Sequence, residues 1–192
     1  MSISVATPPG AEPVVWVDMK VHMRVSSNTE QTLGEALITS ARAYIENWTS
    51  RTLITTVYDY TLDSRPSSIE LPRAGVQSIT SVTITDEDGS DIIVTASNYR
   101  LDTTGEIDKV VLKSDGEWGE TVEPFTHMTV RFVAGYGDAA SSIPAPIIAA
   151  TKILVAHWFE NRELIVVGTN TTPEIEMTVT ALLEPYKVWR TM

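Results

Sequence analysis

Apolar side chains recur every three or four residues in two stretches of the chain, the spacing that places them on one face of a helix. The first stretch runs from about residue 29 to 49, and the second begins at Ser142 or Pro144 and ends near Asn161. The apolar face of the first comprises Leu33, Leu37, Tyr44 and Trp48, with Ala36, Ala41 and Ile45 beside it. The face of the second comprises Ile147, Ala150, Leu154, His157 and Trp158, with Ile148, Val155 and Phe159 beside it. We expect the two helices to pack together through these faces.

Shorter helices are expected next to the long ones. Asp18 can cap a helix over about residues 19–24, because its carboxylate can accept hydrogen bonds from the N–H groups of the first turn. Ser27 and Glu30 have the spacing of a capping box ahead of the first long helix. A further short helix is predicted over residues 178–187.

The hydrophobic period changes from helical to two between residues 51 and 133, which predicts β-strands. These segments are rich in Thr, Val, Ile and Tyr, the residues that favour strands. They are TLITTVYDYTLD, SSIELP, QSITSVTITD, DIIVT, NYRLD, EIDKVVLK and MTVRFVA. Turn signals such as Asp88-Gly89 and Asp115-Gly116 separate them. Short strands joined by such turns predict an antiparallel sheet or a small barrel.

The order of these elements predicts an α+β fold, with a helical core of two long helices plus short terminal helices and an inserted antiparallel β-module. Residues 1–13 hold three prolines and a glycine and are expected to form a flexible N-terminal arm. The helical core is assigned to residues 14–50 and 139–192, and the β-rich module to residues 51–138.

Composition narrows the possible chemistry. The 192 residues are 43% hydrophobic, as in ordinary globular proteins, and none is a cysteine, which excludes thiol catalysis and disulfide scaffolds. Fourteen basic against 25 acidic residues give a formal net charge of −11. Nucleic-acid binding through phosphates requires clusters of Lys and Arg, so the charge argues against tight DNA binding. The simpler interpretation of the negative net charge is that it keeps the protein soluble.

Three groups of residues could carry chemistry, and each has a structural explanation that we favour. The carboxylates Asp86, Glu87, Asp88 and Asp91 flank Gly89 and could bind calcium, but their spacing fails the EF-hand pattern and fits a solvated hairpin tip. The residues 135–138, Gly-Tyr-Gly-Asp, follow a strand and precede a helix, where a phosphate could bind. They lack the spacing and the lysine of a P-loop, so a structural turn is expected, with the first glycine at positive φ.

The remaining candidates for catalysis or metal binding are the three histidines. His22, His127 and His157 show no zinc-ligand spacing, and no GxSxG element is present. The sequence therefore predicts no enzyme, no metal site and no cofactor.

Two segments are candidates for contacts with partners. Tyr186, Trp189 and Arg190 form an aromatic and basic cluster, and these residue types dominate binding energies at protein interfaces. Packing on the chain's own domain is the alternative for the aromatics. Asn161, Arg162 and Glu163 close the second long helix. They can act as a local cap with an ion pair or as a contact between subunits.

Several segments, in order along nearly the whole chain, resemble the head–tail connector (adaptor, or head completion) family of tailed bacteriophages and gene transfer agents. They are KVHMRV (20–25), EALITSARAYIENWTSRTL (35–53), LPRAGVQSITSV (71–82), NYRLD (98–102), VRFVAGYGDAASSIPAPI (130–147), HWFENRE (157–163) and ALLEPYKVWR (181–190). Ser50 departs from the family pattern, which often has Gly after this helix.

The resemblance implies a structural virion protein located at the head–tail junction, and in the host cytoplasm during assembly. It implies a twelvefold ring that binds the portal through the C-terminal tail and a stopper or tail-terminator type of neck protein on the other side. Double-stranded DNA would pass through a passive lumen without specific binding, and no membrane is involved. The alternative is a β-rich binding module, a receptor or glycan reader that uses Trp118 and the loops around it. A hydrolase is the third choice, and the missing motifs argue against it.

Overall fold

The structure is a computed structural model that describes residues 1–118, 125–161 and 172–189. It shows the predicted α+β class, with helices and two antiparallel sheets. The chain divides into two compact units. The β unit comprises Met1–Pro9, Thr55–Gly135 and Val188–Met192, and the helical unit comprises Gly10–Ile54 and Tyr136–Lys187. No helix among the described residues is long and apolar enough to cross a membrane.

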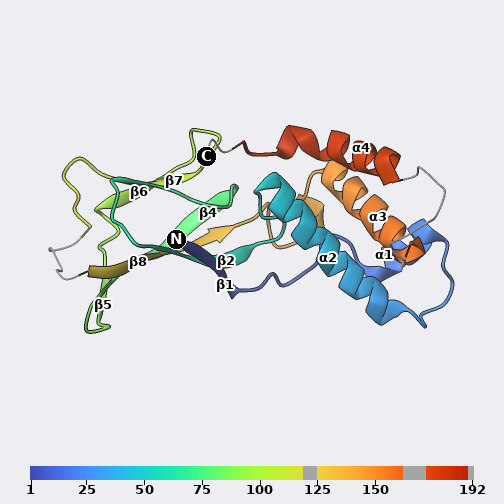
Figure 1. Cartoon of the computed structure of the whole chain (residues 1–192), viewed down its shortest axis with the longest axis horizontal. Coiled ribbons are helices and arrows are strands. Elements are labelled where there is room, and N and C mark those ends of the chain that lie inside the picture. Colours follow the sequence, from blue (N-terminus) through green and yellow to red (C-terminus); the bar gives the residue numbers. More distant parts are fainter. Residues whose placement is uncertain (119–124, 162–171, 190–192) are drawn as a thin grey trace. The chain divides into compact units, whose positions relative to one another are not determined.

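The β unit contains a five-stranded and a three-stranded sheet, and every strand pair in both is antiparallel (Figure 1). The order of the larger sheet is β1-β2-β8-β4-β5, with strands β1 (Ser2–Thr7), β2 (Thr56–Leu62), β8 (Phe125–Ala134), β4 (Val76–Asp86) and β5 (Asp91–Ile93). The order of the smaller is β3-β7-β6, with β3 (Ser68–Glu70), β7 (Lys109–Leu112) and β6 (Tyr99–Asp102). Each predicted β segment overlaps one of strands β2 to β8, and β4 and β8 begin before their predicted segments.

Side chains from both sheets form the core of the β unit. Alternate positions of β8 are fully buried, at Met128, Val130 and Phe132, because successive residues of a strand point to opposite faces. The other members of this core come from β2, β3, β4, β6, β7 and the loops between them, and include Tyr58, Leu62, Ile69, Leu71, Val82, Ile84, Tyr99, Val110 and Trp118. The period-two pattern of the sequence therefore marks the buried face correctly.

The first part of residues 1–13 forms a β-strand rather than the flexible arm that the sequence predicted. Ser2–Thr7 form β1, which pairs with β2 in a register that places Ile3 opposite Tyr60. The Met1 ammonium also lies 3.0 Å from the Asp63 carboxylate. Prolines and the glycine begin only at Pro8, so nothing in residues 2–7 opposes a strand. The paired residues of β1 and β2 lie fifty or more positions apart in sequence, and local turn signals cannot reveal such a pairing.

The helical unit comprises α1 (Trp16–Met23), α2 (Gln31–Thr49), α3 (Ala145–Glu160) and α4 (Thr172–Leu183), with short 3₁₀ turns η1 (Ala140–Ser142) and η2 (Glu184–Tyr186). As predicted, α2 and α3 contact each other although about a hundred residues separate them in the sequence. α3 also contacts α1 and α4. Pro144 precedes α3, and Pro146 lies in its first turn, where the missing N–H is tolerated.

The buried face of α2 differs from the predicted one. Ile38, Ala41 and Ile45 are buried, whereas Leu33 and Tyr44 are exposed by 37% and 45%. Leu37 and Trp48 are half-buried against the core. The rings of Tyr44 and half-buried Trp158 are nearly perpendicular, with their centroids 6.0 Å apart. The aromatic side chains of α2 therefore lie at the edge of its buried face, and Ile38, Ala41 and Ile45 form the centre. Hydrophobic spacing alone does not reveal which of these neighbouring rows faces the core.

Two predicted helix starts are also corrected. α1 begins at Trp16 after Val15, so Asp18 lies inside the first turn rather than capping it. α2 follows Glu30, whose side chain makes no capping hydrogen bond. Ser27 Oγ instead accepts a hydrogen bond from the Thr29 N–H at 3.0 Å. This local turn uses the hydroxyl that the capping box would need. The C-terminal helix begins earlier than predicted, at Thr172.

Ser50 ends α2 in the left-handed conformation, with φ 55° and ψ 27°. This conformation costs an L-residue roughly 1–2 kcal/mol, and glycine adopts it freely. Glycine also gains about 0.5–1 kcal/mol of chain entropy in the unfolded state. We therefore expect Ser50→Gly to raise the free energy of unfolding by about 0.5–1 kcal/mol, measured by urea denaturation. Ser40→Gly, inside the same helix, is the control and should destabilise. A loss of stability with Ser50→Gly would show that the serine is not strained.

Candidate interaction surfaces

The acidic segment at residues 86–91 is a hydrogen-bonded hairpin tip. The Ser90 N–H donates to Asp86 Oδ1 at 2.8 Å, and the Gly89 N–H donates to the Asp86 carbonyl at 3.2 Å. Asp91 Oδ1 accepts a hydrogen bond from Thr85 Oγ1 at 2.7 Å. Within the described ranges, no three His, Asp or Glu side chains are grouped as metal ligands. These contacts fit the turn that we favoured from the sequence.

The glycines after β8 form a structural turn. Gly135 has φ 140° and Gly137 has φ 153°, so both lie in the positive region, as predicted for the first. The Gly135 N–H donates to the Gly75 carbonyl at 3.0 Å, and the next N–H, of Tyr136, donates to the Leu53 carbonyl at 3.2 Å. These two donors are therefore already engaged within the protein rather than presented to a phosphate.

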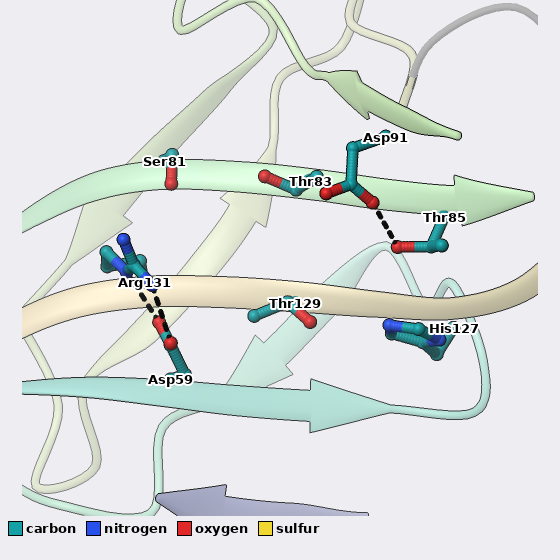
Figure 2. Close-up of a pocket in the computed structure, with 8 residues that line it drawn as sticks. All are labelled: Asp59, Ser81, Thr83, Thr85, Asp91, His127, Thr129 and Arg131. Atoms are coloured by element: carbon teal, nitrogen blue, oxygen red, sulfur yellow. Dashed lines mark hydrogen bonds and ion pairs between the residues drawn. The ribbon is translucent and has the colours of Figure 1, made fainter. Parts of the chain in front are cut away.

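The outer face of the large sheet carries a polar hollow of about 380 Å³ (Figure 2). Its lining side chains come from β2, β4, β5 and β8, and they are Asp59, Ser81, Thr83, Thr85, Asp91, His127, Thr129 and Arg131. The residues that alternate with the buried ones line it: Ser81, Thr83 and Thr85 on β4, and His127, Thr129 and Arg131 on β8. His127 is the one histidine of the β unit, so this hollow does not bring the three histidines together.

A paired cation lies in this hollow. Arg131 Nε and Nη2 each donate to one oxygen of Asp59 at 2.7 Å (Figure 2). The hydrogen bond from Arg131 lowers the pKa of Asp59 below its ordinary value of 3.8. A carboxylate with a lowered pKa stabilises the fold above its unfolded-state pKa and loses that contribution as the pH falls through the folded one. The pair therefore stays ionised at neutral pH, and its charges cancel within the hollow.

The C-terminal segment is anchored at its start and exposed at its end. Tyr186, in η2, is half-buried against the helical core, and its carbonyl accepts a hydrogen bond from Arg51 Nε at 2.6 Å. Lys187 Nζ lies 4.5 Å from the centre of the Trp48 ring. Val188 is only 2% exposed. Trp189, by contrast, is 60% exposed, and its N–H donates to Glu106 Oε1 at 3.2 Å.

The structure separates the predicted contact residues into different environments. Tyr186 packs on its own unit and Trp189 faces solvent, while Arg190 lies outside the described residues. Asn161 is exposed and forms a local cap, because its Nδ2 donates to the His157 carbonyl at 2.9 Å. Arg162 and Glu163 also lie outside the described residues. Sequence reasoning missed the anchoring roles of Lys187 and Val188, which no local pattern signals.

Two further surfaces of the helical unit were not predicted. The first, the α1 outer face, is formed by Val17, Lys20, Val21, Arg24, Val25 and Ser26. The second, the α1–α2 groove, has a volume of about 360 Å³ and is lined by Glu12, Val14, Val15, Trp16, Glu35, Ile38 and Thr39. Apolar residues on two opposite sides of α1 were the available signal, since a helix with two apolar sides is normally covered on both.

Trp118 is not available as a ligand platform. It is 7% exposed, stacks on Tyr99 with ring centroids 6.2 Å apart, and donates its indole N–H to the Pro66 carbonyl at 2.9 Å. The residues that follow it, 119–124, lie outside the described residues. The glycan reader suggested by the sequence therefore loses the aromatic side chain on which it depended, because this tryptophan is part of the core of the β unit.

Exposed apolar and aromatic side chains such as Val17, Val21 and Trp189 suit contacts with other macromolecules. A sequence model of the head completion protein family matches residues 18–187. The match covers most of the chain, and the chain therefore belongs to the head completion protein family. The family is structural rather than catalytic, and it is the one that the sequence motifs predicted.

Solved structures with the same fold come from gene transfer agent particles. A chain from the neck of an empty particle, determined with C6 symmetry, aligns with a TM-score of 0.80 and 21% identity. Chains from the virion of a native particle and from a native neck with C12 symmetry both give 0.81 and 21%. Each alignment covers 100% of this chain and 98% of the other. No curated protein matches the chain.

Proposed function

We propose that this protein is the head–tail adaptor of a tailed phage or gene transfer agent, part of the neck of the virion. In this role it forms a ring between the portal and a stopper or tail-terminator type of neck protein. The helical core, interrupted by the β unit as an insertion, is the part that builds the ring. The observation that carries the proposal is the family match over residues 18–187. The shared fold with neck chains of particles with C6 and C12 symmetry supports a closed ring, for which twelve copies are expected.

The C-terminal segment is the part that we propose to bind the portal. Within the β unit, Val188 is buried and the Trp189 N–H donates to Glu106, so the backbone that carries the exposed Trp189 side chain is held in place. A large aromatic side chain held in place loses little entropy on binding, and Trp and Arg are common among the residues that dominate interfaces. Trp189 with the following Arg190 therefore forms the proposed anchor, and Tyr186 remains a proposed contact residue of the same segment. Asn161, Arg162 and Glu163 remain a proposed contact between subunits.

Substitution of Trp189 tests this assignment. We expect Trp189→Ala to leave the thermal unfolding of the purified protein unchanged, because the side chain is 60% exposed. Loss of an interface anchor costs roughly 2 kcal/mol or more, which exceeds a tenfold loss of affinity. Particles made with the variant should contain DNA-filled heads without tails, counted by electron microscopy. Met177→Ala removes another exposed apolar side chain and is the control. Normal numbers of tailed particles with Trp189→Ala would exclude Trp189 as the anchor.

The passive lumen predicts weak binding of DNA. A chain with a net charge of −11 releases few counterions from duplex DNA. We expect no binding tighter than roughly 1 µM at physiological salt, even for the assembled ring, measured by fluorescence anisotropy with a labelled duplex. Tighter binding that falls steeply with salt concentration would show a basic DNA-binding surface and contradict the passive lumen.

A further inference from the structure

α1 is apolar on two sides, and its outer side is uncovered in the single chain. Trp16 and Met19 point into the helical core and are 5% and 0% exposed. Val17 and Val21, one turn apart on the outer face, are 69% and 78% exposed. A helix with apolar side chains on opposite sides is normally buried on both. The α1 outer face therefore has the character of a surface that another macromolecule covers.

The α1 outer face is also basic in a strongly acidic protein. Lys20 and Arg24 lie one turn apart beside the two valines and line the same hollow. Lys20 Nζ donates to Asn28 Oδ1 at 2.6 Å, and neither cation has a carboxylate partner among the described residues. Asp18 belongs to the same helix but does not line this hollow. The fitting partner is therefore apolar at its centre and acidic at its rim.

The α1–α2 groove of the same unit has this complementary character. Its floor is formed by Val14, Trp16 and Ile38, and Glu12 and Glu35 line it together with Thr39. Glu12 is already paired with Arg42 at 2.8 Å, so its charge is partly neutralised. Glu35 is exposed and accepts a hydrogen bond from Gln31 Nε2 at 2.8 Å, with no cation beside it among the described residues. Among the described residues, Glu35 is therefore the carboxylate of the groove that has no ion pair.

We propose that the α1 outer face of one copy docks into the α1–α2 groove of the next copy. Val17 and Val21 enter the groove, and Lys20 and Arg24 face Glu35. The two surfaces share no residue, so one chain can use both at once and join a neighbour on each side. Such head-to-tail contacts generate a ring when the rotation between copies closes. The inference rests on the proposed ring and names the contact that builds it.

Charge complementarity is the reason to assign the contact to a second copy. Two copies that each carry a net charge of −11 repel one another at long range. A basic surface placed against an acidic one offsets this repulsion locally, and the α1 outer face is such a basic surface. The apolar centres of the α1 outer face and the α1–α2 groove supply the buried area. Their opposite charges favour contact between these two surfaces over contact between two identical ones.

Disulfide trapping tests the contact, because the chain has no cysteine of its own. Full-length Val21→Cys and Thr39→Cys chains that differ in length by a tag are mixed at high concentration and mildly oxidised. Both positions are exposed, so neither substitution should disturb the fold. We expect the mixed dimer on a non-reducing gel to exceed, by roughly tenfold, the mixed dimer of Val21→Cys with Thr180→Cys, an exposed position on α4.

Charge reversal then tests the ionic part of the same contact. Adding Lys20→Glu and Arg24→Glu to the Val21→Cys chain should lower the mixed dimer roughly tenfold. Adding Glu35→Lys to the Thr39→Cys chain should restore it. Circular dichroism of each variant confirms that the helical unit remains folded. An unchanged yield after Lys20→Glu and Arg24→Glu, or no restoration by Glu35→Lys, would overturn the assigned pairing.

The possible failures separate this contact from the proposed function. Preferential Val21→Cys homodimers would show that two α1 outer faces meet symmetrically, which overturns the contact. The contact would also be overturned if Val21→Cys formed no more mixed dimer with Thr39→Cys than with Thr180→Cys. In either case tail loss with Trp189→Ala would still support the adaptor. Conversely, the disulfide-linked dimer could form while particles with Trp189→Ala still carry normal tails. That result would support the contact between copies and exclude Trp189 as the portal anchor.

Discussion

Replacing Phe132 with alanine is expected to lower the free energy of unfolding by about 3–5 kcal/mol, the range for a fully buried aromatic side chain. Phe132 is 0% exposed in β8, which lies in the middle of the five-stranded sheet. Its ring stacks on that of Tyr58, with centroids 5.5 Å apart and an angle of 27° between the planes. The substitution leaves a cavity that rigid neighbouring strands cannot fill, so both contacts and buried area are lost.

Urea denaturation followed by tyrosine and tryptophan fluorescence measures this loss. The two compact units can unfold in separate steps, so the transition assigned to the β unit is the relevant one. Arg131→Ala is a matched control on the neighbouring residue, whose side chain points to the opposite face and is 48% exposed. Loss of its exposed ion pair with Asp59 should cost at most about 1 kcal/mol. A Phe132→Ala cost no larger than that of the control would contradict the assigned core.

Gly34→Ala should destabilise the helical unit by about 2 kcal/mol, although alanine is the better helix former by roughly 1 kcal/mol. A Cβ at Gly34 would lie 2.0 Å from Cζ3 and 2.3 Å from Cε3 of the Trp16 ring. Trp16 is 5% exposed and also contacts Phe159, with ring centroids 5.9 Å apart, so it cannot simply move away. Overpacking of a core costs typically 1–3 kcal/mol, and a clash this close should exceed the gain in helix propensity.

A double-mutant cycle distinguishes the clash from other effects of the alanine. Trp16→Leu removes the clashing ring and is itself destabilising. In its presence, Gly34→Ala should become neutral or stabilising, because only the helix propensity then remains. Thermal unfolding of the four proteins provides the measurement. If Gly34→Ala stabilises the protein that retains Trp16, the close packing of α1 on α2 is wrong.

Strands β2 to β8 were predictable because the pattern that defines them is local in the sequence. Residues such as Met128, Val130 and Phe132 alternate with polar ones, and a strand places alternate residues on opposite faces whatever its partners are. The α2 and α3 helices were predictable because their apolar residues recur every three or four positions, which is also a local pattern. The turn at Gly135 followed from the glycine itself, because positive φ is open to that residue at little cost. The family followed from the motifs carried by these elements.

The candidate contacts were only partly predictable. Trp189 stood out in the sequence as an aromatic residue near a chain end, and the structure shows it exposed. The contacts of Tyr186 with Arg51 and of Lys187 with Trp48 join residues more than a hundred positions apart, so no local pattern could indicate them. The α1 outer face was missed because apolar residues such as Val17 and Val21 resemble core residues in the sequence, and only their exposure distinguishes them.

The sequence by itself therefore determined strands β2 to β8, the two long helices, the α+β class and the family, since hydrophobic period, turn residues and motifs are local properties. The tertiary structure decided the pairing of β1 with β2, the choice of Ile38 and Ile45 rather than Leu33 and Tyr44 for the core, and the close approach of Trp16 to Gly34. These features depend on which surfaces meet. The free energy of burying a side chain is set by neighbours that are distant in sequence, and that information is absent from any single segment.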